Sequence, residues 1–110
     1  DKAILTLQSG LLFEHHVIHE LLARHHGQYE LSYWRTKQGQ EVDLIVEYKA
    51  RVIALEIKNT SKPRPEDFKG LEAFRKQARC DRSYLICNIN RPQKFSNGTA
   101  LPWRQIDSVF

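Results

Sequence analysis

An alternation of apolar and polar positions predicts strands through the middle of the chain. Residues 29–35 are rich in aromatic and β-favouring side chains, and residues 41–48 and 52–58 alternate with a period of two. A period of two places successive side chains on opposite faces of a sheet. The polar stretches 37–40 and 49–51 are typical of turns. We therefore expect three consecutive strands in an antiparallel meander.

Helical spacing of apolar residues appears on both sides of this meander. Between residues 10 and 25 apolar side chains recur at helical intervals, and Gly27 then provides a stop signal. A second helix is expected to begin at Pro65, because proline is favoured at the first helical position and acidic residues follow it. Its buried face is predicted to hold Phe68, Leu71, Phe74 and Ala78.

The remaining segments complete a mixed sheet. Residues 83–88 form a short apolar run, which predicts a fourth strand that pairs in parallel with an earlier one through the helical crossover. The segment from there to residue 110 is expected to supply a further edge strand or loop and a short tail. The predicted fold class is α/β, with an α-β-β-β-α-β order, a helix on each side of the sheet, and a single domain spanning residues 1–110.

Three polar residues are expected to converge at one end of the predicted hairpin. Period two places Glu56 and Lys58 on the same face at the end of strand 52–58, and hairpin pairing brings Asp43 beside them. Two carboxylates can hold a divalent cation while the lysine holds a water through its ammonium, or deprotonates it as the neutral amine, as phosphodiester hydrolysis requires. The alternative is an ion pair at a strand end on a half-exposed sheet. The same periodicity places Val42 on one face with Leu44, Val46 and Tyr48.

Glu14 is the one acid predicted to lie inside an apolar helix face. At about 100° per residue, the apolar stripe of the first helix is centred close to Glu14. A carboxylate in that position needs a partner, because acids are seldom buried unpaired. A metal ligand or general base is one interpretation, and a buried structural pair is the other. The stripe consists of Leu11, Val17, Ile18, Leu21 and Leu22.

These residues resemble a known superfamily. Asp43, the Glu56-Ile57-Lys58 string and the preceding Glu14 are similar to the motifs of the PD-(D/E)XK nucleases, although Val42 stands where the superfamily name has proline. The resemblance implies a restriction-endonuclease-like core and a hydrolase activity. It makes Asp43 and Glu56 ligands of Mg²⁺ or Mn²⁺, Lys58 the water-activating residue, and Glu14 the accessory acid of the same metal site.

A narrower resemblance runs from about Gly10 to Trp103. The strings 10–14, 33–35, 41–45 and 56–59 are similar to an uncharacterised C-terminal domain (DUF4143-like) that follows an AAA-type ATPase in bacteria and archaea. It implies an ATPase upstream in the same chain, and ATP only through that domain, since these residues contain no GxxxxGK[ST]. The absence of Met, including an initiator, leads us to expect a piece of a longer protein.

Members of this superfamily also include modules that keep the fold without cleaving nucleic acid, and fold alone does not decide activity. The competing expectation is therefore an inactive module that binds DNA or a protein partner and regulates or assembles the ATPase. Such a module would keep the acids as relics.

Charge favours DNA as a partner. The net charge is +4, and residues 61–110 carry the whole basic excess, ten Lys and Arg against five Asp and Glu. A basic helix face can neutralise phosphates, although the polar side of an ordinary amphipathic helix gives the same pattern. The residues of the predicted DNA-binding arc are Lys69, Arg75, Lys76 and Arg79.

Other features narrow the classes of protein and site. No apolar run is long enough to span a bilayer and no signal peptide is evident, so we expect a cytoplasmic protein without membrane contact. Cys80 and Cys87 are too few for a disulfide framework or a structural zinc site. All five histidines fall near the first helix, where His15 and His19 form an i, i+4 pair that predicts either solvated surface or a transition-metal site.

Overall fold

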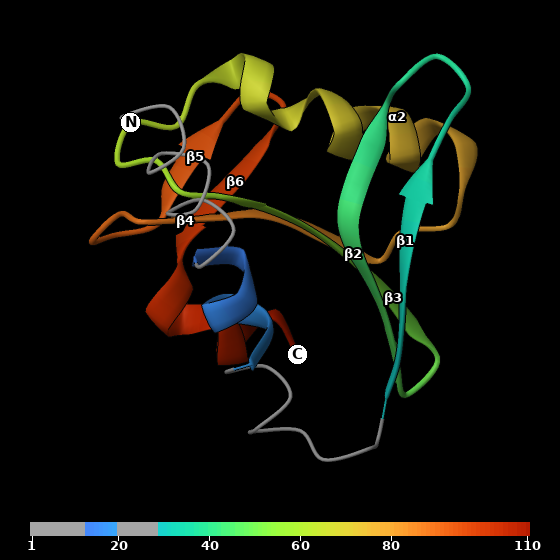
Figure 1. Ribbon diagram of the computed structural model, residues 1–110, viewed down its shortest axis with the longest axis horizontal. Coiled ribbons are helices and arrows are strands. Elements are labelled where there is room, and N and C mark those ends of the chain that lie inside the picture. Colours follow the sequence, from blue (N-terminus) through green and yellow to red (C-terminus); the bar gives the residue numbers. More distant parts are fainter. Residues whose placement is uncertain (1–12, 20–28) are drawn as a thin grey trace, which may run out of the picture.

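The computed structural model describes residues 13–19 and 29–110. Residues 13–19 are helical. The other elements, in chain order, are β1 (Tyr29–Arg35), β2 (Glu41–Tyr48), β3 (Arg51–Lys58), the 3-10 helix η1 (Pro65–Phe68), α2 (Lys69–Gln77), β4 (Arg82–Cys87), β5 (Gln93–Phe95), β6 (Gly98–Pro102) and the 3-10 helix η2 (Trp103–Val109). The strands form one six-stranded sheet in the order β1-β2-β3-β4-β6-β5 (Figure 1).

The predicted meander is confirmed. β1 pairs antiparallel with β2, and β2 pairs antiparallel with β3. The β2–β3 turn holds Lys49 and Ala50 at φ values of 50° and 64°, the left-handed geometry that a tight two-residue hairpin requires. The first hairpin closes through Thr36, whose backbone N–H donates to the carbonyl of Gln40 at 2.8 Å.

The predicted parallel crossover is also confirmed. The chain leaves β3, passes through η1 and α2, and returns as β4, which pairs in parallel with β3. The C-terminal segment differs from the expectation of one edge strand or loop, because it forms a β5–β6 hairpin. β6 inserts between β4 and β5 and pairs in parallel with β4, so that β5 is the edge strand.

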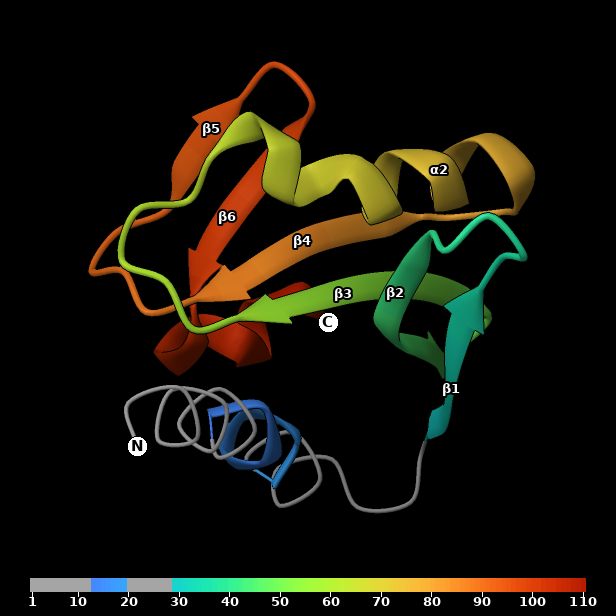
Figure 2. The same cartoon turned by 45° about the horizontal axis from the view of Figure 1, so that its top comes forward.

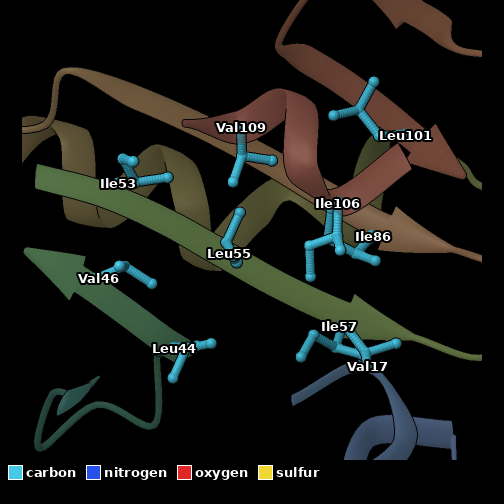
Figure 3. Close-up of a cluster of buried hydrophobic side chains, with 10 residues drawn as sticks. All are labelled: Val17, Leu44, Val46, Ile53, Leu55, Ile57, Ile86, Leu101, Ile106 and Val109. Carbon is cyan, nitrogen blue, oxygen red and sulfur yellow. The ribbon is translucent and has the colours of Figure 1, made fainter. Parts of the chain in front are cut away.

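Helical segments cover both faces of the sheet, as predicted. Figure 2 shows η1 and α2 on one side of the strands, and the helical residues 13–19 with η2 on the other. The cluster on the second side joins strand residues to Val17, Ile106 and Val109 (Figure 3). The whole is an α/β fold with a mixed sheet flanked by helices. The strand residues of this cluster are Leu44, Val46, Ile53, Leu55, Ile57, Ile86 and Leu101.

The opposite cluster packs α2 against the sheet. Phe68, Leu71 and Phe74 are buried in it, as predicted for this helix. The prediction for Ala78 is wrong, since this residue is exposed and its extended backbone lies beyond the end of α2. Ala73, five residues earlier and within α2, is buried instead.

A β-bulge in β2 overturns the predicted placement of Val42. Ser32 pairs with Ile45 and Trp34 pairs with Val42, so β2 contains one residue more than β1 between these two pairs. An extra residue interrupts the alternation of faces. Val42 therefore packs with Ile45 under α2, and it does not join Leu44 in the opposite cluster.

No helix within residues 13–19 and 29–110 has the length and apolar character needed to cross a bilayer.

Candidate active site

Asp43 and Glu56 lie opposite each other where the β2–β3 ladder stops. The last regular pair is Leu44 with Leu55, and the next position of that register joins Asp43 to Glu56. The backbone N–H of Asp43 donates to Glu56 Oε1 at 3.2 Å, and the N–H of Ile57 donates to Asp43 Oδ2 at 2.9 Å. Side-chain oxygens therefore satisfy backbone donors at the point where the ladder ends.

The two carboxyl groups share one confined environment. Burial of Glu56, its side-chain hydrogen bond with Asp43 and the negative charge of Asp43 raise the pKa of Glu56 to about 9. Two neighbouring carboxylates resist simultaneous ionisation, so at neutral pH this pair holds a proton. A proton held in this way is one that a cation can replace.

Glu14 joins this pair from the helical segment 13–19. Val17 anchors the segment, because its side chain is 0% exposed and lies beside Ile57 in Figure 3. Glu14, three residues earlier, is half-buried, and burial together with the charge of Asp43 raises its pKa. Glu14 therefore lies at the wall of a cavity that it shares with Asp43, and the comparison with the whole apolar stripe extends outside the described residues.

One cavity of about 500 Å³ contains all four predicted catalytic residues in its wall. Lys58 lines it together with the acids Glu14, Asp43 and Glu56. The adjoining Glu41 also lines it and forms an ion pair with Arg35 at 3.3 Å. A slightly larger cavity, of about 580 Å³, lies at the opposite end of β2 and β3 and holds none of these four residues.

Lys58 has a partner that the sequence reasoning missed. Its Nζ lies 2.6 Å from Oδ1 of Asp67, a residue of η1 that lines the same cavity. Burial opposes ionisation of Asp67, but hydrogen bonds from Lys58 and from the backbone of Arg64 outweigh it and lower the pKa of Asp67. The position of Asp67 in the first turn after Pro65 predicts a helix cap, but it does not reveal Lys58 as a partner.

Gly70 allows α2 to approach the site closely. A Cβ at this position would collide with the carbonyl oxygen of Glu41 and lie 3.3 Å from Oε2 of Glu56. The first turn of α2 therefore forms a wall of the cavity against the start of β2. A glycine is needed here because of this close packing.

The predicted DNA-binding arc is divided in the structure. Lys69 and Lys76 are exposed and line one shallow pocket of about 270 Å³, which adjoins the acidic cavity through Lys69. Arg75 is half-buried and donates to Ser83 Oγ and to the carbonyl oxygen of Asn97, each at 2.7 Å.

Arg79 lies beyond the end of α2, and its guanidinium donates to the carbonyl of Ala50 at 2.8 Å. Lys69 and Lys76 are therefore the members of the arc that the structure brings together beside the cavity.

The histidine pair shows the solvated arrangement. His15 and His19 are exposed, and so is His16, whose ring meets Trp103 edge-on with centroids 4.7 Å apart. His25 and His26 lie outside the described residues. Trp34, an aromatic residue of β1, packs edge-on against Phe74.

Tyr33 differs from these aromatic residues. It is 72% exposed and lines a pocket shared with Glu14 and Asp43.

The donor set fits a hard divalent cation in its chemistry. Carboxylate oxygens are the ligands that Mg²⁺ and Mn²⁺ prefer. Within the described ranges, no three acidic, imidazole or thiol groups are close enough in their present positions to coordinate one ion. One oxygen of Asp43 and one of Glu56 accept from backbone N–H groups, and binding of one ion by all three acids requires side-chain movement.

One comparison with known proteins identifies the family of the chain. The sequence model of the family described as "Domain of unknown function (DUF4143)" matches residues 9–106, so the chain belongs to this family. No curated protein matches the chain. No solved structure matches it either.

Proposed function

We propose that this member of the DUF4143 family is a metal-dependent deoxyribonuclease domain of the PD-(D/E)XK type, which hydrolyses phosphodiester bonds. The observation that carries the proposal is the position of Asp43 beside Glu56 just beyond the last β2–β3 pair, where the N–H of Asp43 donates to Glu56 Oε1. A purely structural ion pair at a strand end would join an acidic and a basic side chain. Here two acidic side chains face each other instead, and a third acid, Glu14, lines the same cavity. Such an excess of negative charge favours a cation.

The three acids would hold the ion through hard oxygen ligands. A bound Mg²⁺ or Mn²⁺ would offset charge on the phosphoryl oxygens and lower the pKa of a coordinated water. Asp43 and Glu56 would be the principal ligands because they face each other from neighbouring strands. Glu14 completes the acidic wall from the helical segment.

Basic side chains in and beside the cavity are suited to a negatively charged DNA substrate. Lys58 presents its ammonium to the cavity and would hold the attacking water. Lys69 and Lys76 form a positively charged surface on the exposed side of α2, next to the cavity. There they would contact phosphates of the DNA strand. An AAA-type ATPase domain upstream in the same chain, in a cytoplasmic protein, is the setting that we propose for this activity.

Cleavage assays test the proposal directly. Fluorescently labelled single-stranded, duplex and branched DNA should be cut by the protein with Mg²⁺ or Mn²⁺. Glu56→Gln should lower the rate by at least about 100-fold, because it removes a ligand while keeping the hydrogen-bond acceptor. Glu66→Gln is the matched control, since Glu66 lines the same cavity but is exposed and lies 3.5 Å from Arg64. Intact DNA on all three substrates with both metals would contradict the proposal.

One observation supports a second candidate, a non-cleaving module that binds DNA or a protein partner. The ammonium of Lys58 is already engaged by Asp67, as in a purely structural ion pair. In that case DNA binding, measured by fluorescence anisotropy, should survive Glu56→Gln and fall when Lys69 and Lys76 are both changed to Glu. Cleavage that depends on Glu56 would exclude this candidate.

A further inference from the structure

Asp67 and Lys58 form an ion pair with unequal exposure. Lys58 ends β3 and Asp67 lies nine positions later, in η1, with Nζ and Oδ1 only 2.6 Å apart. The side chain of Asp67 is 4% exposed, whereas that of Lys58 is 47% exposed. The acid is thus the hidden partner, and the ammonium is the one that a ligand can reach.

The carboxylate of Asp67 is itself held in place. Its Oδ2 accepts a hydrogen bond from the backbone N–H of Arg64 at 2.9 Å, and its own N–H donates to the carbonyl of Arg64 at 3.0 Å. The neighbouring Phe68 is 0% exposed and packs against Phe95. These contacts fix the position of the Asp67 carboxylate, which can then restrain the longer and more flexible side chain of Lys58.

The ammonium of Lys58 keeps donors for a ligand. A lysine ammonium carries three N–H groups, and the bond to Asp67 Oδ1 uses one of them. Lys58 and Asp67 line the same cavity as Asp43 and Glu56. A lysine that is already held on one side loses less conformational freedom when it binds a ligand on the other.

We propose that Asp67 is a positioning residue of this site, which fixes the ammonium of Lys58 at the cavity wall so that its remaining donors hold the attacking water. The nature of the ligand rests on the proposed nuclease function. The placement of the ammonium rests on the contacts of Asp67 alone.

A role for Asp67 only in shaping the loop before α2 is the alternative, and the chain offers a matched control for it. Asp81 lies in the loop before β4, and its Oδ2 likewise accepts from a backbone N–H, that of Val52, at 2.7 Å. It also pairs with a cation, Arg79, at 3.2 Å. Asp81 lies beside the start of β3, whereas Asp67 lies beside its end. Asp81→Asn therefore removes a similar ion pair far from the acidic cavity.

Steady-state kinetics separate the two roles. Asp67→Asn keeps an oxygen for the N–H of Arg64 but loses the charge that holds Lys58, so kcat should fall about 10- to 100-fold with KM changed less than about 3-fold. Asp67→Glu should restore part of kcat, and Asp67→Asn should add no further loss in a Lys58→Met background. Asp81→Asn should leave kcat unchanged. Equal kinetic losses in Asp67→Asn and Asp81→Asn, after urea unfolding has shown both variants to be folded, would overturn the inference.

A spectroscopic measurement decides the inference without cleavage. In protein labelled with ¹⁵N at lysine side chains, the ammonium signal of Lys58 should move on Asp67→Asn and stay in place on Asp81→Asn. If the wild-type protein cleaves no DNA, the proposed function fails and this comparison alone decides the inference. The inference is overturned if the Lys58 signal does not move on Asp67→Asn, or if it moves equally in both variants.

Discussion

The side chains of Asp43 and Glu56 each accept a hydrogen bond from a backbone N–H of the opposite strand, at the position where the regular β2–β3 pairing ends. Glu56 Oε1 accepts from the N–H of Asp43, and Asp43 Oδ2 accepts from the N–H of Ile57. Each acid therefore supports the fold as well as the candidate site. Variants that keep the acceptor oxygen and remove the charge can separate these two contributions.

Stability should fall with rising pH because of Glu56. Its pKa of about 9 in the folded protein exceeds the ordinary value of 4.5. The folded state therefore holds this proton more tightly than the unfolded chain, and stability present at low pH is lost as pH rises towards 9. One such group changes the unfolding free energy by at most about 1.4 kcal/mol per pH unit. Between pH 6 and pH 9, urea unfolding should show a smaller decrease in unfolding free energy for Glu56→Gln than for wild type. Equal decreases in the two proteins would contradict this account.

The structural role of Asp43 predicts different effects of two substitutions. Asp43→Ala leaves the N–H of Ile57 without its acceptor, which should cost about 1–3 kcal/mol of unfolding free energy. Asp43→Asn keeps an acceptor and removes the charge beside Glu56, so its stability should stay close to that of wild type. Chemical denaturation measures the difference. Asn and Ala variants of equal stability would show that this hydrogen bond does not support the fold.

Metal binding should release a proton. Because the Asp43–Glu56 pair holds a proton at neutral pH, a cation that binds both carboxylates should displace about one proton and bind more tightly as pH rises. Titration calorimetry with Mn²⁺ in two buffers of different ionisation enthalpy measures this release. Glu56→Gln should abolish it and Glu66→Gln should not. Binding without proton release, or binding unaffected by Glu56→Gln, would place the ion elsewhere.

Gly70→Ala should disturb the site through the backbone. The added Cβ meets the carbonyl of Glu41, which cannot move without shifting β2, so a cost of about 1–3 kcal/mol is expected. Gly39→Ala is a useful contrast, because nothing lies within 4 Å of its added Cβ and only its φ of 89° opposes the change. Because Gly39 is only two residues from Glu41, the comparison is made farther along β2, where backbone amide shifts should change in Gly70→Ala alone. Unchanged shifts there would mean that α2 does not press on β2.

The sequence predicted the elements that depend on local pattern. Strands 29–35 and 41–48 agree with the structure at both ends, since side-chain alternation and turn residues act over short distances. The helix beginning at Pro65 is confirmed as η1 followed by α2. Helical periodicity predicted an inward Glu14, which lines the cavity with Asp43.

Features that depend on pairing between distant segments were not predicted. The reversed face of Val42 arises from the unequal number of residues between two β1–β2 pairs, which neither strand reveals alone. The contact between Lys58 and Asp67 spans a loop whose path the pattern of residues does not specify. The insertion of β6 beside β4 likewise depends on how the sheet is completed.

Because of the bulge in β2, the direction of the Asp43 side chain depends on the number of residues in the strand as well as on their identity. If Leu44 were deleted, every carboxylate would remain in the sequence and Val42 would stay on the face of Ile45, but Asp43 would move to the position opposite Leu55 and away from Glu56. A deletion of one residue at this point is thus a more severe lesion for the site than many substitutions. Alignments that place a gap here would misassign the acid even where the motif letters agree.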